Sequence, residues 1–105
     1  MGSVETLRVV HFDLSKAVLA IHHYRGDVAH IVVPLRTIIS DAVKLGTAGL
    51  LLSHNHPSGD PTPSESDLTM TLQVRDAAQV LGINLHDHLI IGKSRELSFR
   101  SQGYL

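Results

Sequence analysis

The chain has 105 residues, 43% of them hydrophobic and 18% charged, which suits one domain with a packed core and argues against intrinsic disorder. Its formal net charge is −1 at pH 7 and its nine lysines and arginines are scattered, so charge does not indicate a nucleic-acid partner. Cysteine is absent, which excludes disulfide scaffolds and cysteine-based zinc ribbons.

The N-terminal third of the chain predicts strands. Residues 7–12 and 17–22 are rich in β-forming side chains and flank the turn-forming residues 13–16, as in a hairpin. Arg25-Gly26-Asp27 predicts a second turn, with Arg25 exposed to solvent, and residues 29–33 predict a third strand.

Two helices and three more strands follow in the predicted order. The first helix has apolar positions Leu35, Ile38, Ile39 and Ala42, between Pro34 at its start and Gly46 at its end. Residues 48–53 form a short apolar run without polar alternation, typical of a central strand buried on both faces. The second helix, residues 64–81, has apolar positions Leu68, Leu72, Ala78 and Leu81, a core position at Met70, and Gly82 at its end. Residues 86–91 and 96–99 complete an α/β fold with a mixed sheet flanked by helices.

Two histidines, His54 and His56, follow the predicted central strand. Residues two apart on an extended backbone point to the same side, so both imidazoles can face one ion. Asp67, in the first turn of the next helix, offers a carboxylate as a third ligand. Two nitrogens and one oxygen leave a tetrahedral zinc ion with one position for water, which is the pattern of catalytic sites.

Helix capping is an alternative role for the same residues. Ser64 is a favourable N-cap residue, Asp67 stands at the third helical position, and Pro63 precedes the pair. Capping explains Ser64 and Asp67 but does not explain two histidines before a loop rich in proline and glycine.

The spacing His54-x-His56, seven residues, Ser64, two residues, Asp67 resembles the JAMM signature of MPN-type metalloproteases. With the Pro-Ser-Gly-Asp-Pro loop and the later run from Asp87-His88 to Gly92, it resembles the C-terminal domain of bacterial RadC proteins. The resemblance implies a cytidine-deaminase-like JAB/MPN sandwich.

The resemblance also implies a mechanism. One zinc ion per chain would be held by His54, His56 and Asp67, and Ser64 would help to hold the oxyanion. The family uses a glutamate near an early strand as general base, and Glu5 is the only glutamate before the motif. The implied function is hydrolysis of a peptide or isopeptide-like amide bond in a peptide or protein substrate that the sequence does not identify.

The alternative is a non-catalytic or accessory RadC-type domain that acts through protein or DNA partners in repair or recombination. We expect one cytoplasmic domain over residues 4–105, with residues 1–3 a cloning remnant and no membrane span. RadC proteins often carry a helix-hairpin-helix segment before this domain, which we expect to have been removed or to be absent from a short form. The sequence does not indicate the oligomeric state.

The remaining histidines carry weaker signals. His86 and His88 lie on the strand after the second helix, and we expect buried, hydrogen-bonded structural roles for them. The alternative is that they support a metal ligand through a hydrogen bond. No role is assigned to His11, His22, His23 and His30.

Overall fold

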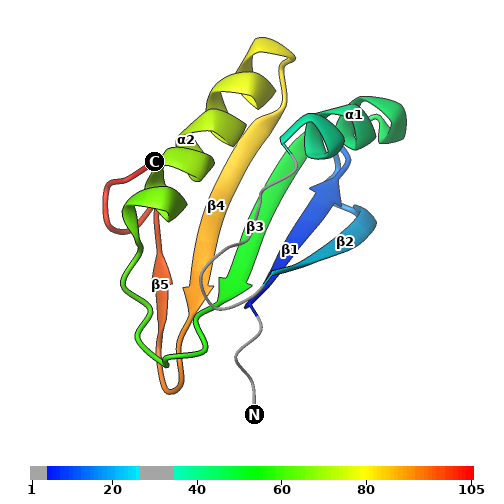
Figure 1. Ribbon diagram of the computed structural model, residues 1–105. Helices are drawn as coiled ribbons and strands as arrows, with labels where there is room; N and C mark the ends of the chain where they lie inside the picture. The colour runs from blue at the N-terminus through cyan, green and yellow to red at the C-terminus, as the bar shows by residue number, and fades with distance from the viewer. Residues whose placement is uncertain (1–4, 27–34) are drawn as a thin grey trace.

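The structure is a computed structural model that describes residues 5–26 and 35–105. The predicted third strand, Pro34 and residues 1–3 lie outside the described residues. In chain order, the described elements are β1 (Glu5–Phe12), β2 (Val18–Gly26), α1 (Leu35–Leu45), β3 (Gly49–Asn55), α2 (Glu65–Val80), β4 (Asn84–Ile91) and β5 (Glu96–Ser98), as Figure 1 shows.

The strands form one mixed sheet in the order β2-β1-β3-β4-β5, with β3 at its centre as predicted. β1 pairs antiparallel with both β2 and β3, and β4 pairs antiparallel with β5. Among the described strands only β3 and β4 are parallel, and α2 connects them, as a parallel pair requires. The predicted α/β fold with a mixed sheet is confirmed.

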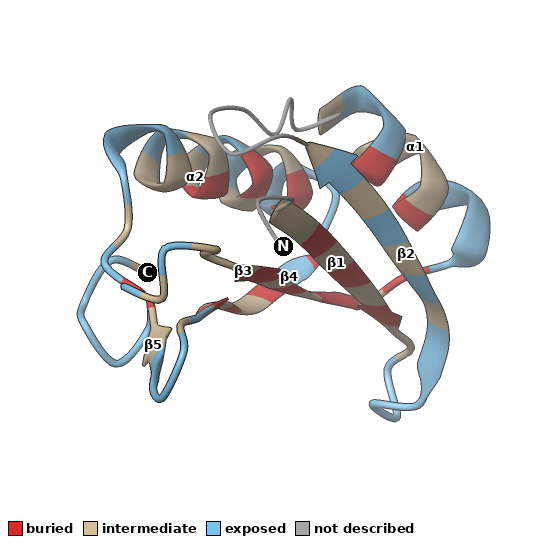
Figure 2. Ribbon diagram, turned by 60° about the horizontal axis from the view of Figure 1, so that its bottom comes forward, coloured by how far each residue is buried: buried red, intermediate tan, exposed pale blue. Residues whose placement is uncertain are grey.

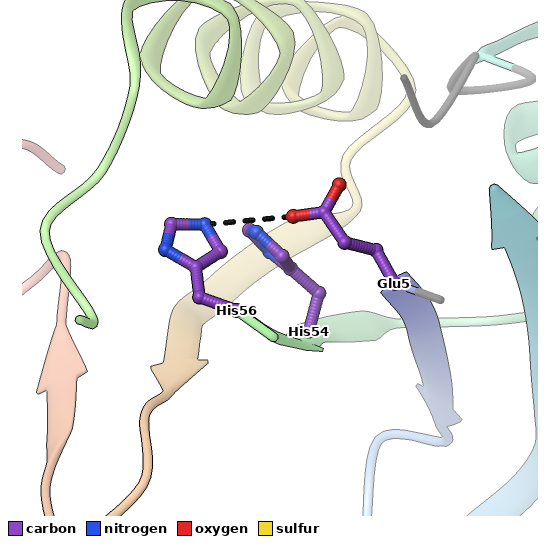
Figure 3. A group of neighbouring side chains, drawn as sticks. All are labelled: Glu5, His54 and His56. Carbon is purple, nitrogen blue, oxygen red and sulfur yellow. Dashed lines mark ion pairs between the residues drawn. The ribbon is translucent and has the colours of Figure 1, made fainter. Parts of the chain in front are cut away.

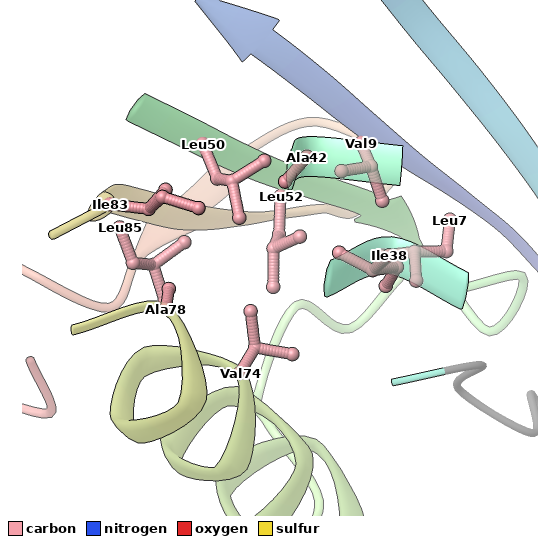
Figure 4. Packing of buried hydrophobic residues seen from close by; sticks show 10 residues of the cluster. All are labelled: Leu7, Val9, Ile38, Ala42, Leu50, Leu52, Val74, Ala78, Ile83 and Leu85. Atoms are coloured by element: carbon pink, nitrogen blue, oxygen red, sulfur yellow. The ribbon is translucent and has the colours of Figure 1, made fainter. Parts of the chain in front are cut away.

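Both described helices pack over the same face of the sheet, and the buried residues lie between these two layers (Figure 2). The cluster of buried hydrophobic residues, drawn in Figure 4, comprises Leu7, Val9, Ile38, Ala42, Leu50, Leu52, Val74, Ala78, Ile83 and Leu85.

The prediction that β3 is buried on both faces is wrong in part. Leu50 and Leu52 are fully buried towards the helices, whereas Leu51, which points to the other face, is only half-buried.

Gly46 and Gly82 terminate the two helices, as the sequence predicts. Gly46 and Gly82 have φ angles of +71° and +72°. After α2, Gly82 N–H donates to Gln79 O and Ile83 N–H donates to Ala78 O, which is the hydrogen-bond pattern of a Schellman motif.

The predicted apolar face of α2 needs one correction. Leu81 is 51% exposed because it is the C-cap residue, where the helix has already ended. The buried positions are Thr71, Val74 and Ala78, and Met70 packs beside this core as expected. Spacings of three and four residues place the buried positions on one face of the helix.

The turn predicted at Arg25 is also corrected. Arg25 is exposed as expected, but it lies within β2 and pairs with Thr6 of β1. β2 therefore continues to Gly26, opposite Glu5, because β1 offers pairing partners along its whole length.

Candidate metal centre

The start of β1 and the end of β3 lie side by side because these two strands are antiparallel. Leu7 is paired with His54 in this register, so Glu5 lies beside the end of β3. The backbone N–H of Thr6 donates to Asn55 Oδ1 over 2.8 Å, which fastens the first residues of β1 to the histidine motif. Residues about 50 positions apart in sequence therefore share one site.

Glu5, His54 and His56 form a compact group of potential metal ligands (Figure 3). One ligand atom from each lies within 4.8 Å of the others. Glu5 Oε1 is 3.8 Å from His56 Nε2, and the centroids of the two imidazole rings are 4.7 Å apart. These three residues could hold a metal ion.

Asp67 approaches the same two histidines from the N-terminal turn of α2. Its Oδ1 lies 3.5 Å from His54 Nε2, and its Oδ2 lies 3.2 Å from His56 Nε2. The structure thus brings together the three ligands expected from the sequence and adds Glu5 beside them. Which carboxylate would bind an ion stays a prediction.

Ser64 and Asp67 form a capping box. Asp67 N–H donates to Ser64 Oγ over 3.0 Å, and Ser64 N–H donates to Asp67 Oδ2 over 2.8 Å. Capping and metal binding are compatible, because the cap itself holds the carboxylate against the histidines. Accepting a hydrogen bond uses a lone pair of Ser64 Oγ and leaves its proton to donate elsewhere. The predicted oxyanion role of Ser64 is thus compatible with the cap and stays a prediction.

The loop after β3 fixes the orientation of His56. His56 Nδ1 lies 2.8 Å from Asp60 O, and since a carbonyl oxygen only accepts, Nδ1 carries the proton. The other ring nitrogen, Nε2, faces the carboxylates and lies 3.2 Å from Asp67 Oδ2 and 3.8 Å from Glu5 Oε1. Asp60 is itself held by the backbone N–H and the hydroxyl of Thr62, and these hydrogen bonds lower the pKa of its carboxyl group.

His54 is almost fully buried, at 1% exposure. Burial lowers the pKa of His54 to about 4, so the ring is neutral at physiological pH. Its Nδ1 lies 2.7 Å from His88 Nε2, whereas its Nε2 has no hydrogen-bond partner among the described residues. A buried polar atom without a partner is costly, and binding an ion would relieve that cost.

The donor set fits a divalent cation on these grounds. Imidazole nitrogens and carboxylate oxygens, all of which can bind a metal ion, converge within 3.2–3.8 Å of one another. Nitrogen and oxygen ligands of this kind suit zinc, and binding through one nitrogen while the other donates is the usual arrangement of a metal-bound histidine.

His88 is fully buried and hydrogen-bonded, as predicted. Burial lowers the pKa of His88 to about 3. Its partners are His54 and Thr71, so it lies directly behind a predicted ligand. Thr71 was not predicted, although its spacing of four residues from Asp67 places both on one face of α2.

His86 lies apart from this group. It is half-buried, its ring packs across Gly49 and against Phe12, and its Nδ1 is 3.0 Å from the Asn84 amide nitrogen. Its predicted burial is therefore only partial.

A second pair of histidines lies near α1. His11 is fully buried and its Nδ1 is 2.8 Å from Thr47 Oγ1, while His22 Nδ1 is 3.4 Å from Asp41 Oδ2. Burial lowers the pKa of His11. This pair does not bring three ligand atoms together, and within residues 5–26 and 35–105 only the Glu5, His54 and His56 group meets that spacing.

The family model for the RadC-like JAB domain matches residues 1–104. A UPF0758 protein of Ruegeria pomeroyi is 51% identical over 102 residues, covering 96% of this chain and 46% of the relative. UPF0758 proteins of Rhodobacter capsulatus and Clostridium botulinum are 50% and 36% identical over 96% of the chain, which covers 48% and 44% of their lengths. The chain spans about half the length of the curated relatives it matches. No described helix is long and apolar enough to cross a membrane.

Proposed function

The chain belongs to the RadC-like JAB domain family, and on that premise we propose that it is a zinc-dependent hydrolase of peptide or isopeptide-like amide bonds. The observation that supports this most strongly is the convergence of His54 Nε2 and His56 Nε2 on the Asp67 carboxylate, at 3.5 and 3.2 Å. Glu5 adds a second carboxylate at 3.8 Å from His56.

In this proposal His54, His56 and Asp67 hold one zinc ion. When bound, the ion supplies a Lewis acid that polarises the amide carbonyl and activates a water molecule. The two imidazoles present lone pairs, and the capping box prevents the Asp67 carboxylate from turning away.

Glu5 acts as general base and then as general acid. Its carboxylate takes a proton from the attacking water as the water oxygen bonds to the carbonyl carbon. The carbon–nitrogen bond then breaks, and the proton leaves on the departing amine. Glu5 is half-buried at the start of β1, where the Thr6–Asn55 hydrogen bond restricts its backbone.

Ser64 donates its hydroxyl proton to the oxyanion that forms when water adds to the carbonyl. Its hydroxyl oxygen is held in place by the N–H of Asp67. One residue would then both start α2 and stabilise charge in the transition state.

The test is a search for cleavage products by mass spectrometry. The 105-residue chain, loaded with zinc, is incubated with a proteome-derived peptide library and with an isopeptide-linked lysine peptide. We expect new termini with the zinc-loaded chain and none with the chelator-treated protein or with Glu5→Gln. Equal product formation in all three samples would contradict the proposal.

The non-catalytic alternative stays a prediction with its own test. Binding to duplex or branched DNA in an electrophoretic shift assay should weaken steeply with salt if phosphate contacts contribute. The absence of a salt-sensitive shift would leave that alternative without a nucleic-acid role.

A further inference from the structure

A chain of hydrogen bonds runs behind the candidate metal centre and joins two of the proposed ligands. His54 Nδ1 lies 2.7 Å from His88 Nε2, and His88 Nδ1 lies 2.6 Å from Thr71 Oγ1. The Thr71 hydroxyl in turn donates to the backbone carbonyl of Asp67 over 2.7 Å. His54, His88 and Thr71 are each at most 1% exposed, so water does not compete for these bonds.

The direction of each bond follows from the one at the end. The Asp67 carbonyl can only accept a hydrogen bond, so the Thr71 hydroxyl donates its single proton to it. The Thr71 oxygen must therefore accept a hydrogen bond from His88. His88 Nδ1 therefore carries the proton, and His88 Nε2 of the neutral ring is an acceptor. His54 must then donate through Nδ1, which leaves the lone pair of His54 on Nε2.

That lone pair belongs to the buried Nε2 of His54, which has no hydrogen-bond partner among the described residues and lies 3.5 Å from Asp67 Oδ1. If every bond ran in the opposite direction, Nε2 would carry the proton and could not bind a metal ion. The backbone carbonyl of Asp60 fixes the same tautomer in His56. His54 depends instead on two side chains, those of His88 and Thr71, for the same result.

His88 is held rigidly from the C-terminal side. Its ring stacks on Phe99, with centroids 4.4 Å apart and an interplanar angle of 21°. Asp87 Oδ1 accepts from the backbone N–H groups of His88, at 2.7 Å, and Arg100, at 3.0 Å, and its Oδ2 accepts from the Ser98 hydroxyl. These bonds fasten the segment that carries Phe99 to β4.

We propose that His88 and Thr71 are positioning residues that fix the tautomer of His54, so that its Nε2 presents a lone pair to the metal. This inference rests on the proposed zinc site. His88 and Thr71 themselves do not touch metal or substrate. Asp87 and Phe99 support this arrangement by fixing the plane of the His88 ring.

The test uses one matched pair of variants at Thr71. Thr71→Val keeps the shape of the side chain but removes the hydroxyl, and Thr71→Ser keeps the hydroxyl. Without an acceptor, a proton on His88 Nδ1 would be buried and unsatisfied, so His88 should move it to Nε2 and donate to His54. We expect Thr71→Val to convert His54 to the Nε2–H tautomer and Thr71→Ser to retain the Nδ1–H tautomer.

Two measurements separate this inference from the proposed function. Long-range ¹H–¹⁵N NMR of the metal-free protein reports the tautomer of His54 without any zinc or activity. Competition with a chelator of known affinity gives the zinc dissociation constant, which we expect to rise about 10- to 100-fold in Thr71→Val and His88→Phe and not in Thr71→Ser. His88→Phe preserves an aromatic ring against Phe99, and circular dichroism checks that each variant is folded.

The outcomes are distinguishable. An Nε2–H tautomer of His54 in the metal-free wild type, or wild-type tautomer and zinc affinity in Thr71→Val, would overturn the inference even if the protein binds zinc and cleaves peptides. The expected tautomers in a wild type that takes up no zinc would support the hydrogen-bond direction and overturn the proposed function alone.

Discussion

Ser64 and Asp67 are joined by two reciprocal hydrogen bonds, of 2.8 and 3.0 Å, that close the first turn of α2. The oxygen of Asp67 that accepts from Ser64 is also the one that lies 3.2 Å from His56 Nε2. The helix cap and the candidate metal centre therefore share an atom. A change that loosens the cap should also loosen the site.

Two substitutions at Ser64 separate capping from catalysis. Ser64→Ala should lower the free energy of unfolding by about 1 kcal/mol, whereas Ser64→Gly should lower it by only a few tenths. Both lack the hydroxyl, so both should lose turnover about 10²- to 10³-fold per zinc-loaded, folded molecule if Ser64 donates to the oxyanion. Urea unfolding and peptide cleavage measure the two effects. Near-normal turnover in Ser64→Gly would assign the residue to capping alone.

Glu5→Gln tests the general base. The amide keeps the size of the side chain but cannot take a proton, so turnover should fall about 10²- to 10⁴-fold while zinc content stays near one per chain. Glu65→Gln is a matched control, because Glu65 is an exposed acid in the first turn of α2. If Glu5→Gln loses its zinc, the residue is a ligand and the role assigned to it is wrong.

The metal-free protein should lose stability in acid. Burial lowers the pKa of His88 to about 3 and that of His54 to about 4, from an ordinary value of 6.5. The unfolded chain therefore binds more protons below about pH 6.5, so the free energy of unfolding falls as pH drops through that window towards the folded pKa values. Each histidine adds a slope of up to about 1.4 kcal/mol per pH unit.

Urea unfolding of metal-free protein at several pH values between about 4 and 8 measures this slope. The titratable groups that influence His88 are His54, His56, Asp67 and Asp87. His88→Phe should flatten the slope, whereas His23→Gln, a change at an exposed residue of β2, should not. An unchanged slope in His88→Phe would contradict the predicted linkage.

Gly92 should be needed for the loop that carries His56. A Cβ atom at Gly92 would lie 2.4 Å from Gly59 O and 3.0 Å from a Pro61 side-chain atom, so the loop would have to move. Gly59 N–H donates to His56 O over 2.9 Å, which links that movement to the ligand. Gly92→Ala should weaken zinc binding while the core stays folded. Ser94→Ala, an exposed change in the same connection between β4 and β5, should leave the zinc affinity unaltered.

Local pattern was sufficient for most of the fold. Gly46 and Gly82 end the helices, β3 is central, and the spacing of Ser64 and Asp67 predicts their capping box. These features depend on residues near one another in sequence, where backbone preference and periodicity act directly.

Features that depend on tertiary register were not predictable. In the sequence, Thr71 is only a polar residue within a predicted helix. Its burial follows from the placement of α2 over His88 of β4. Arg25 reads as a turn residue, and only the pairing of β2 with β1 keeps it in a strand. The site depends on both kinds of information, since the motif predicts which residues bind the ion and the packing orients the two histidine rings.

Zinc-edge anomalous diffraction from crystals of the zinc-loaded chain tests the central claim most directly. The proposed site predicts one strong peak per chain, bounded by His54 Nε2, His56 Nε2 and the Asp67 carboxylate, and loss of that peak in His54→Ala. A zinc-loaded chain with no peak between these residues, or with its zinc bound elsewhere, would contradict the claim.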